Sequence, residues 1–143
     1  MAKRKIILLF NIIVVTCSCN GQNVNELIGS VWVKKGEFCF DSLYFEVDGK
    51  YREYYCDTEY DVKGSYVLHG DTLVLTALQS PAEVLDRYPN AEIDDKESRY
   101  ISSYITKYRF SPDGVIEKVY FMDIITGYES IGVETYWKYR KVK

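Results

Sequence analysis

The chain has 143 residues, with 18 Lys and Arg against 21 Asp and Glu and a net charge of −3, so it suits one domain. Three basic side chains lie among its first five residues; removing residues 1–18 leaves 15 basic and 21 acidic side chains, a net charge of −6 that argues against nucleic-acid binding. Fourteen tyrosines and only three prolines favour a β-rich fold with a partly polar interior.

The N-terminus has the anatomy of an export signal. Lys3, Arg4 and Lys5 precede an almost wholly apolar run at residues 6–15. This run is about half of the roughly 20 apolar residues that a membrane-spanning helix needs. We therefore expect a targeting segment rather than a lasting transmembrane span.

The segment Thr16-Cys17-Ser18-Cys19-Asn20 resembles the lipobox of bacterial lipoproteins. The resemblance implies a signal peptide at residues 1–18, acylation (palmitate) of Cys19, a tether at residues 19–28 and a domain at residues 29–143. Cys17 is the alternative lipidation site, and an unanchored protein cut near Gly21 is the other interpretation. Because no charge occurs between Cys19 and Glu26, the resemblance favours the outer membrane, facing the periplasm.

Alternation of apolar and polar residues predicts eight strands. They lie at residues 29–35, 37–47, 50–57, 60–68, 71–78, 99–110, 115–125 and 133–142. Glycine-containing turns at Asp48-Gly49, His69-Gly70 and residues 111–114 predict antiparallel neighbours. The seventh strand is apolar on both sides, which indicates a covered outer face or a contact surface.

A short helix is expected between the fifth and sixth strands. Ser80, Pro81 and Glu83 combine an N-cap, a first-turn proline and a capping box. The helix should end near Arg87, and the acidic stretch 90–98 should form an exposed loop.

Two of the strands alternate cleanly enough to assign faces. In the fourth, Tyr60 and Tyr66 share the apolar face, and in the eighth Trp137 and Tyr139 do so. We expect these four side chains to point inward and to be candidate ligand-binding residues. The same alternation puts Arg140 on the opposite side from Trp137 and Tyr139.

Eight strands in hairpin order predict an all-β, eight-stranded antiparallel up-and-down barrel with one short helix inserted between strands 5 and 6. The chain resembles the lipocalin-like barrels of bacterial lipoproteins, on the segments Leu27-Ile28-Gly29-Ser30-Val31-Trp32, Phe45-Glu46-Val47-Asp48-Gly49-Lys50-Tyr51, Gly64-Ser65-Tyr66 and Gly70-Asp71-Thr72-Leu73-Val74-Leu75-Thr76. The resemblance implies a small apolar or aromatic ligand inside the barrel. It also implies that Arg140 is the late arginine of the family, which packs over the tryptophan of the first strand, here Trp32.

Catalytic and metal-binding motifs are not found in the sequence. The single histidine, His69, lies in a predicted turn, and neither a Gly-x-Ser-x-Gly elbow nor a Cys-x-x-Cys pair follows residue 19. The acidic stretch 92–97 has no calcium-loop spacing. We therefore expect that the protein binds no cofactor and no metal and is not an enzyme.

Cys39 and Cys56 remain once Cys19 is acylated, and an even pair in an oxidising compartment favours a disulfide. A two-residue turn at Asp48-Gly49 would pair Val47 with Lys50 and make the cysteines diagonal neighbours, about 7–8 Å apart. That separation is long for a disulfide without a bulge. Bonded and free cysteines both stay open.

Two functions fit these features. The first is a membrane-anchored, lipocalin-like binding protein of the cell envelope. The alternative is a protein-interaction lipoprotein, such as a periplasmic inhibitor or immunity protein, whose contact surface would be residues 80–98. Partners would then be the lipid membrane through Cys19, with a small ligand in the first case or an envelope protein in the second.

Overall fold

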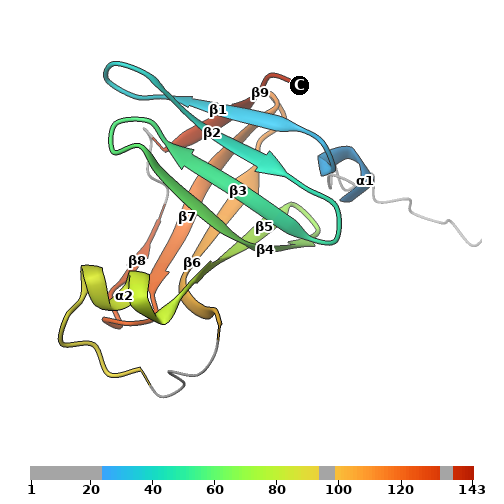
Figure 1. Ribbon diagram of the computed structural model, residues 1–143. Helices are drawn as coiled ribbons and strands as arrows, with labels where there is room; N and C mark the ends of the chain where they lie inside the picture. Colours follow the sequence, from blue (N-terminus) through green and yellow to red (C-terminus); the bar gives the residue numbers. More distant parts are fainter. Residues whose placement is uncertain (1–23, 94–98, 133–136) are drawn as a thin grey trace, which may run out of the picture.

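The computed structural model describes residues 24–93, 99–132 and 137–143, which form a closed antiparallel barrel (Figure 1). The elements are α1 (Val24–Leu27), β1 (Val31–Lys35), β2 (Phe40–Phe45), β3 (Lys50–Tyr55), β4 (Tyr60–His69), β5 (Thr72–Gln79), α2 (Pro81–Arg87), β6 (Ile101–Phe110), β7 (Val115–Asp123), β8 (Glu129–Ile131) and β9 (Lys138–Lys141). The strands β1 to β7 and β9 follow one another around the barrel, and β9 pairs with β1 to close it. The predicted eight-stranded up-and-down barrel with a helix between strands 5 and 6 is confirmed.

The last strand of the barrel differs from its expected form. Both β8 and β9 pair with β7, β8 through Tyr120↔Ile131 and β9 through Val115↔Arg140. Tyr120 and Val115 are five residues apart in β7, whereas their partners Ile131 and Arg140 are nine residues apart in the sequence. The alternation of apolar and polar residues does not reveal these additional residues between the two pairings, and β8 is not among the predicted strands. Of the predicted strand at residues 133–142, residues 133–136 lie outside the described part.

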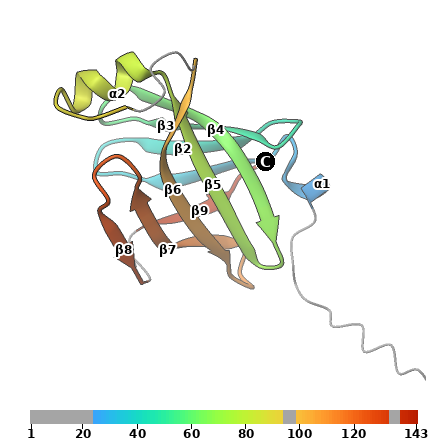
Figure 2. The same cartoon turned by 90° about the horizontal axis from the view of Figure 1, so that it is seen from below.

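The hairpin order puts successive turns at opposite ends of the barrel (Figures 1 and 2). One end, here the α1 end, carries α1, the β2–β3 turn, the β4–β5 turn and the β6–β7 turn. The other, the α2 end, carries the β1–β2, β3–β4 and β7–β8 turns and α2. Each inward side chain can thus be placed along the barrel axis by its position in its strand.

The α1 end is closed by apolar packing. Leu27 is fully buried in one cluster with Trp32, Phe45 and Phe110. The Nε1 of Trp32 donates to the Ser30 hydroxyl (2.9 Å), which in turn donates to the carbonyl of Leu27 (2.6 Å). The described part of the expected tether at residues 19–28, from α1 onward, therefore packs into the folded body.

The β2–β3 turn is one residue longer than expected. Phe45 pairs with Tyr51, and the amide of Glu46 donates to the carbonyl of Lys50 (2.8 Å). Three residues, 47–49, lie between them, and both Asp48 (φ 61°) and Gly49 (φ 67°) have the left-handed conformation that such a turn needs. The predicted pairing of Val47 with Lys50 is wrong by one residue.

Helix α2 follows its predicted capping signals. The amide of Glu83 donates to the Ser80 hydroxyl (3.2 Å), and the amide of Ser80 donates to the Glu83 carboxylate (2.7 Å). Pro81 is the first helical residue and Arg87 the last. In the expected acidic loop at 90–98, residues 94–98 lie outside the described part.

The structure leaves no room for a side chain at Gly64. It lies on the inward face of β4, opposite Tyr51 of β3. A Cβ at this position would lie 2.7 Å from Cε1 of Tyr51 and would collide with the carbonyl of Thr76. Glycine is therefore required for β5 and the Tyr51 ring to approach β4.

We expect Gly64→Ala to lower the free energy of unfolding by about 1–3 kcal/mol, because overpacking a dense interior forces neighbours apart. Urea unfolding measures this change. Ser65→Ala, on the exposed face of the same strand, is the control and should change the free energy by less than about 0.5 kcal/mol. Equal effects of the two substitutions would contradict the assignment.

Candidate ligand site in the barrel

The interior is divided into two unlike halves. Apolar side chains fill the α1 half, including Leu27, Phe45 and Leu73. In the α2 half the inward positions carry Lys34, Asp41, Glu53, Gln79, Lys118 and several tyrosines, and Asp41, Glu53, Gln79 and Lys118 are buried. A buried polar group needs partners, so the contacts of this half define the candidate site.

Glu53 of β3 is the buried acid at the centre of this half, with 2% of its surface exposed. The Tyr139 hydroxyl donates to its Oε1 (2.6 Å), and the Tyr55 hydroxyl donates to the same carboxylate. Burial raises the pKa of Glu53 above its ordinary value, while these two hydrogen bonds and the charge of Lys34 oppose the rise. Burial, followed by the negative charge of Glu53, raises the pKa of Tyr55 and Tyr139.

Trp137 lies between two lysines. Nζ of Lys34, from β1, is 3.9 Å from the Trp137 ring centroid, and Nζ of Lys118, from β7, is 4.1 Å from it. Lys34 also forms an ion pair with Asp41, its cross-strand neighbour (Nζ to Oδ2, 2.8 Å). The Nε1 of Trp137 donates to the Tyr108 hydroxyl (3.1 Å). The Trp137 ring is thereby fixed among cations on the inner surface.

A set of partly exposed aromatic rings lines the α2 half. The Tyr104 and Phe121 centroids are 5.7 Å apart, and those of Tyr55 and Trp137 are 6.4 Å apart. Tyr104 and Phe121 face inward because their strands bring them to the side of the buried Thr106, which pairs with Phe121. A planar ligand that enters from the α2 end would cover the exposed surface of these inward rings.

Hydrogen bonds hold helix α2 and the residue that follows it against this end of the barrel. On one side the Tyr60 hydroxyl accepts hydrogen bonds from Arg87 (2.8 Å) and from Gln79. On the other, the Tyr88 hydroxyl donates to Asp123 Oδ2 (2.9 Å). The rim of the α2 end is therefore polar and aromatic.

The four predicted ligand-binding residues do not all lie in the α2 half. Trp137 and Tyr139 lie together, both in contact with Tyr108, whereas Tyr60 is at the rim. Tyr66 is inward as predicted but belongs to the α1 half, where its ring packs on Phe45 at 5.0 Å. The proposal that Tyr66 lines the same site as the other three is not supported by its position.

The pattern of apolar and polar residues does not identify the charged members of the site, Lys34, Asp41, Glu53 and Lys118. Glu53 lies on the same face of its strand as Tyr51 and Tyr55, but the strand alone does not indicate whether this face or the opposite one points inward. A usable signal is the pairing of Glu53 with Val62, because Val62 lies on the assigned apolar face of the fourth strand. His69 is exposed next to its turn, as expected.

A groove of about 370 Å³ lies on the outer face of β1, β9 and β7. Val33, Phe40, Val115, Lys35 and Arg140 are among the residues that line it. Arg140 thus lies on the opposite side of β9 from Tyr139, as alternation predicted, and the partner ring of Trp32 is Phe110, 5.9 Å away. The family role expected for Arg140 does not fit this position.

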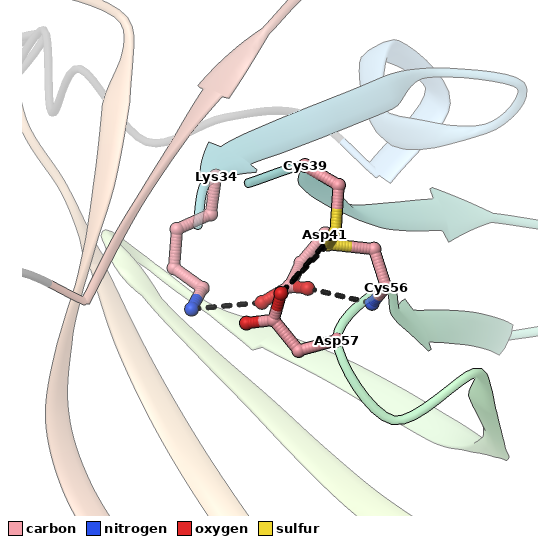
Figure 3. The surroundings of a disulfide bond; sticks show 5 residues. All are labelled: Lys34, Cys39, Asp41, Cys56 and Asp57. Carbon is pink, nitrogen blue, oxygen red and sulfur yellow. Dashed lines mark hydrogen bonds and ion pairs between the residues drawn. A yellow bond between two sulfur atoms is a disulfide. The ribbon is translucent and has the colours of Figure 1, made fainter. Parts of the chain in front are cut away.

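Cys39 and Cys56 form a disulfide at the α2 end, with their α-carbons 6.0 Å apart (Figure 3). The longer β2–β3 turn shifts the pairing by one residue, which brings the cysteines closer than the expected diagonal separation. The Cys56 amide donates to Asp41 Oδ1 (2.9 Å), and Asp57 lies beside the two sulfurs. The disulfide therefore borders the Lys34–Asp41 pair of the candidate site.

No protein-family model, curated protein or solved structure matches this chain. Among the described residues, no helix has the length and apolar character to cross a membrane. The geometry of the barrel interior is therefore the basis for a functional proposal.

Glu53 should make stability depend on pH. The pKa of Glu53 is raised in the folded protein. Between the unfolded and the folded pKa, the folded state therefore binds a proton that the unfolded chain has released, and the free energy of unfolding decreases as pH rises through this range. As pH rises above about 4.5, the free energy of unfolding of the wild type should fall relative to that of Glu53→Gln.

Urea titrations of both proteins across this pH range measure the difference. The same substitution at the exposed Glu92 is the control for a charge change without burial. A wild-type advantage that grows with rising pH would contradict the buried, proton-retaining state of Glu53.

Proposed function

We propose that this protein is a non-catalytic, lipocalin-like binding protein of the cell envelope, anchored through acylated Cys19 and facing the periplasm. Its ligand is a small aromatic molecule held in the α2 half of the barrel. The observation that carries the proposal is the set of inward, partly exposed rings of Tyr55, Tyr104, Phe121 and Trp137 above a buried polar layer.

The polar layer narrows the class of ligand. An aliphatic chain placed against Lys34, Asp41 and Glu53 would remove water from them and return no hydrogen bonds, which is costly. A planar ring with polar substituents can stack on Tyr104 or Phe121 and still exchange hydrogen bonds with the layer below. An aromatic ligand therefore fits better than the purely apolar one that the family resemblance also allows.

A binding role is favoured over catalysis by how the acids are engaged. Glu53 accepts hydrogen bonds from Tyr139 and Tyr55, and Asp41 is paired with Lys34 and with the Cys56 amide. Each carboxyl group is thus held in place by partners inside the barrel. Such groups suit a fixed recognition surface.

The alternative, a periplasmic inhibitor or immunity protein, is favoured by one feature. Phe38 is 86% exposed and Phe40 is 59% exposed, at the tip and base of the β1–β2 turn. Exposed rings of this size are enriched at protein contacts. A pull-down from envelope extract that loses its partner with Phe38→Ser, without loss of ligand binding, would favour this role.

Binding in the barrel can be tested with the dye 8-anilino-1-naphthalenesulfonate as an aromatic probe. Phe121→Ala removes one inward ring and should weaken binding about threefold to tenfold, the value of one aromatic contact. Fluorescence titration gives the dissociation constant.

Tyr120→Ala is the matched control, because Tyr120 is the adjacent residue of β7 and pairs with Lys107, whose Nζ lies 4.7 Å from its ring. This outward substitution should leave dye binding unchanged. Failure of the wild type to bind the dye, or equal losses in both variants, would reject an interior site.

The anchor has a separate test. Cys19→Ala should move the protein from the membrane fraction to the soluble fraction of the envelope, since acyl chains supply the membrane affinity. Cys17→Ala is the control and should leave the protein in the membrane fraction. The reverse result would assign the lipid to Cys17, and release in neither variant would reject lipid anchoring.

A further inference from the structure

Three potential metal ligands meet at the α2 end of the barrel. The two sulfurs of Cys39 and Cys56 and a carboxylate oxygen of Asp57 lie within 4.8 Å of one another. Asp57 Oδ1 is 3.3 Å from Sγ of Cys39 and 3.9 Å from Sγ of Cys56 (Figure 3). In the disulfide the sulfurs carry no proton and offer no thiolate. The two sulfurs can therefore either bond to each other or bind a metal as thiolates, but not both.

The backbone holds these residues together without the sulfur–sulfur bond. Cys39 is fixed by the β1–β2 turn, where the Gly36 amide donates to its carbonyl (2.7 Å). Cys56 is fixed by the hydrogen bond that its backbone N–H donates to Asp41 Oδ1 (2.9 Å), and it directly follows β3, which pairs with β2 as far as Ser42↔Tyr54. Reduction therefore leaves both thiols at neighbouring positions.

Gly36 shows how closely the turn is packed around Asp57. A Cβ at Gly36 would lie 2.9 Å from the Cys39 carbonyl and 3.4 Å from Asp57 Oδ2. The Asp57 carboxylate is thus directed at the turn that carries Cys39 rather than away from the protein.

We propose that reduction of the Cys39–Cys56 disulfide creates a zinc site made of the Cys39 and Cys56 thiolates and the Asp57 carboxylate. A dithiol reductant gives up two electrons and two protons to the disulfide and becomes a cyclic disulfide itself. The two thiols then release two protons as Zn²⁺ binds. Two sulfurs and one oxygen leave the fourth tetrahedral position to water.

The test uses the full chain with Cys17 and Cys19 replaced by serine, so that the only thiols are those of Cys39 and Cys56. The protein is reduced with a dithiol, desalted without oxygen, and titrated with Zn²⁺ against a chromophoric zinc indicator. We expect one zinc per chain in the reduced protein and none in the oxidised protein. Replacement of zinc by Co²⁺ should give a thiolate-to-cobalt charge-transfer absorption.

Variants assign the ligands. In the same background, Cys39→Ser with Cys56→Ser should abolish binding, and Asp57→Asn should weaken it at least about tenfold. Asp61→Asn, at an exposed position of β4, is the control and should leave the affinity unchanged. Circular dichroism of every reduced sample reports whether the barrel persists.

Several outcomes would overturn the proposal. They are zinc binding of equal strength in the oxidised protein, unchanged binding in the double serine variant, and unchanged binding in Asp57→Asn. If the reduced protein unfolds, recovery of the β-sheet spectrum on adding zinc supports the site, and a failure to recover rejects it.

Discussion

The hydrogen bond from Tyr139 to Glu53 is the contact on which the organisation of the barrel interior depends. It joins β9 to β3, across 86 residues of sequence, inside the closed sheet. A carboxylate buried without donors would cost several kcal/mol, so Glu53 is tolerable only where tyrosine hydroxyls reach it. Tyr139 and Tyr55 supply these donors, and the charge of Glu53 also helps to raise the pKa of Tyr51, Tyr104 and Tyr108 in the same interior.

The two halves of the interior have different roles. In the α1 half, apolar side chains from α1 and several strands supply burial and close the barrel. In the α2 half, ion pairs and hydrogen bonds replace part of that apolar contact, and the rings above them stay partly exposed. Because of this division, residues at the α2 rim can change with little effect on the packed α1 half.

Turn chemistry and alternation predicted most of the fold. Ser80 and Pro81 located α2 to the residue, and the alternation around Tyr60 and Tyr139 gave the correct inward faces. These signals are local, so a single segment is sufficient to detect them. The closed barrel then followed from the hairpin order of the strands.

What the sequence did not predict depends on contacts between segments. The length of the β2–β3 turn sets the register, and one residue there decided whether Cys39 and Cys56 could bond. The inward face of β3 depends on its neighbours, which is why Glu53 was missed. The excess chain between β8 and β9 changes the register only relative to β7. Local patterning contains none of this information.

The position of α1 has a consequence for how the protein is presented to its surroundings. The described chain begins at Val24, next to the apolar residues that close the α1 end and at the opposite end of the barrel from α2 (Figures 1 and 2). The aromatic rim and the disulfide beside it therefore lie at the end of the barrel opposite to the one where the described chain begins, so that the N-terminal helix does not cover them.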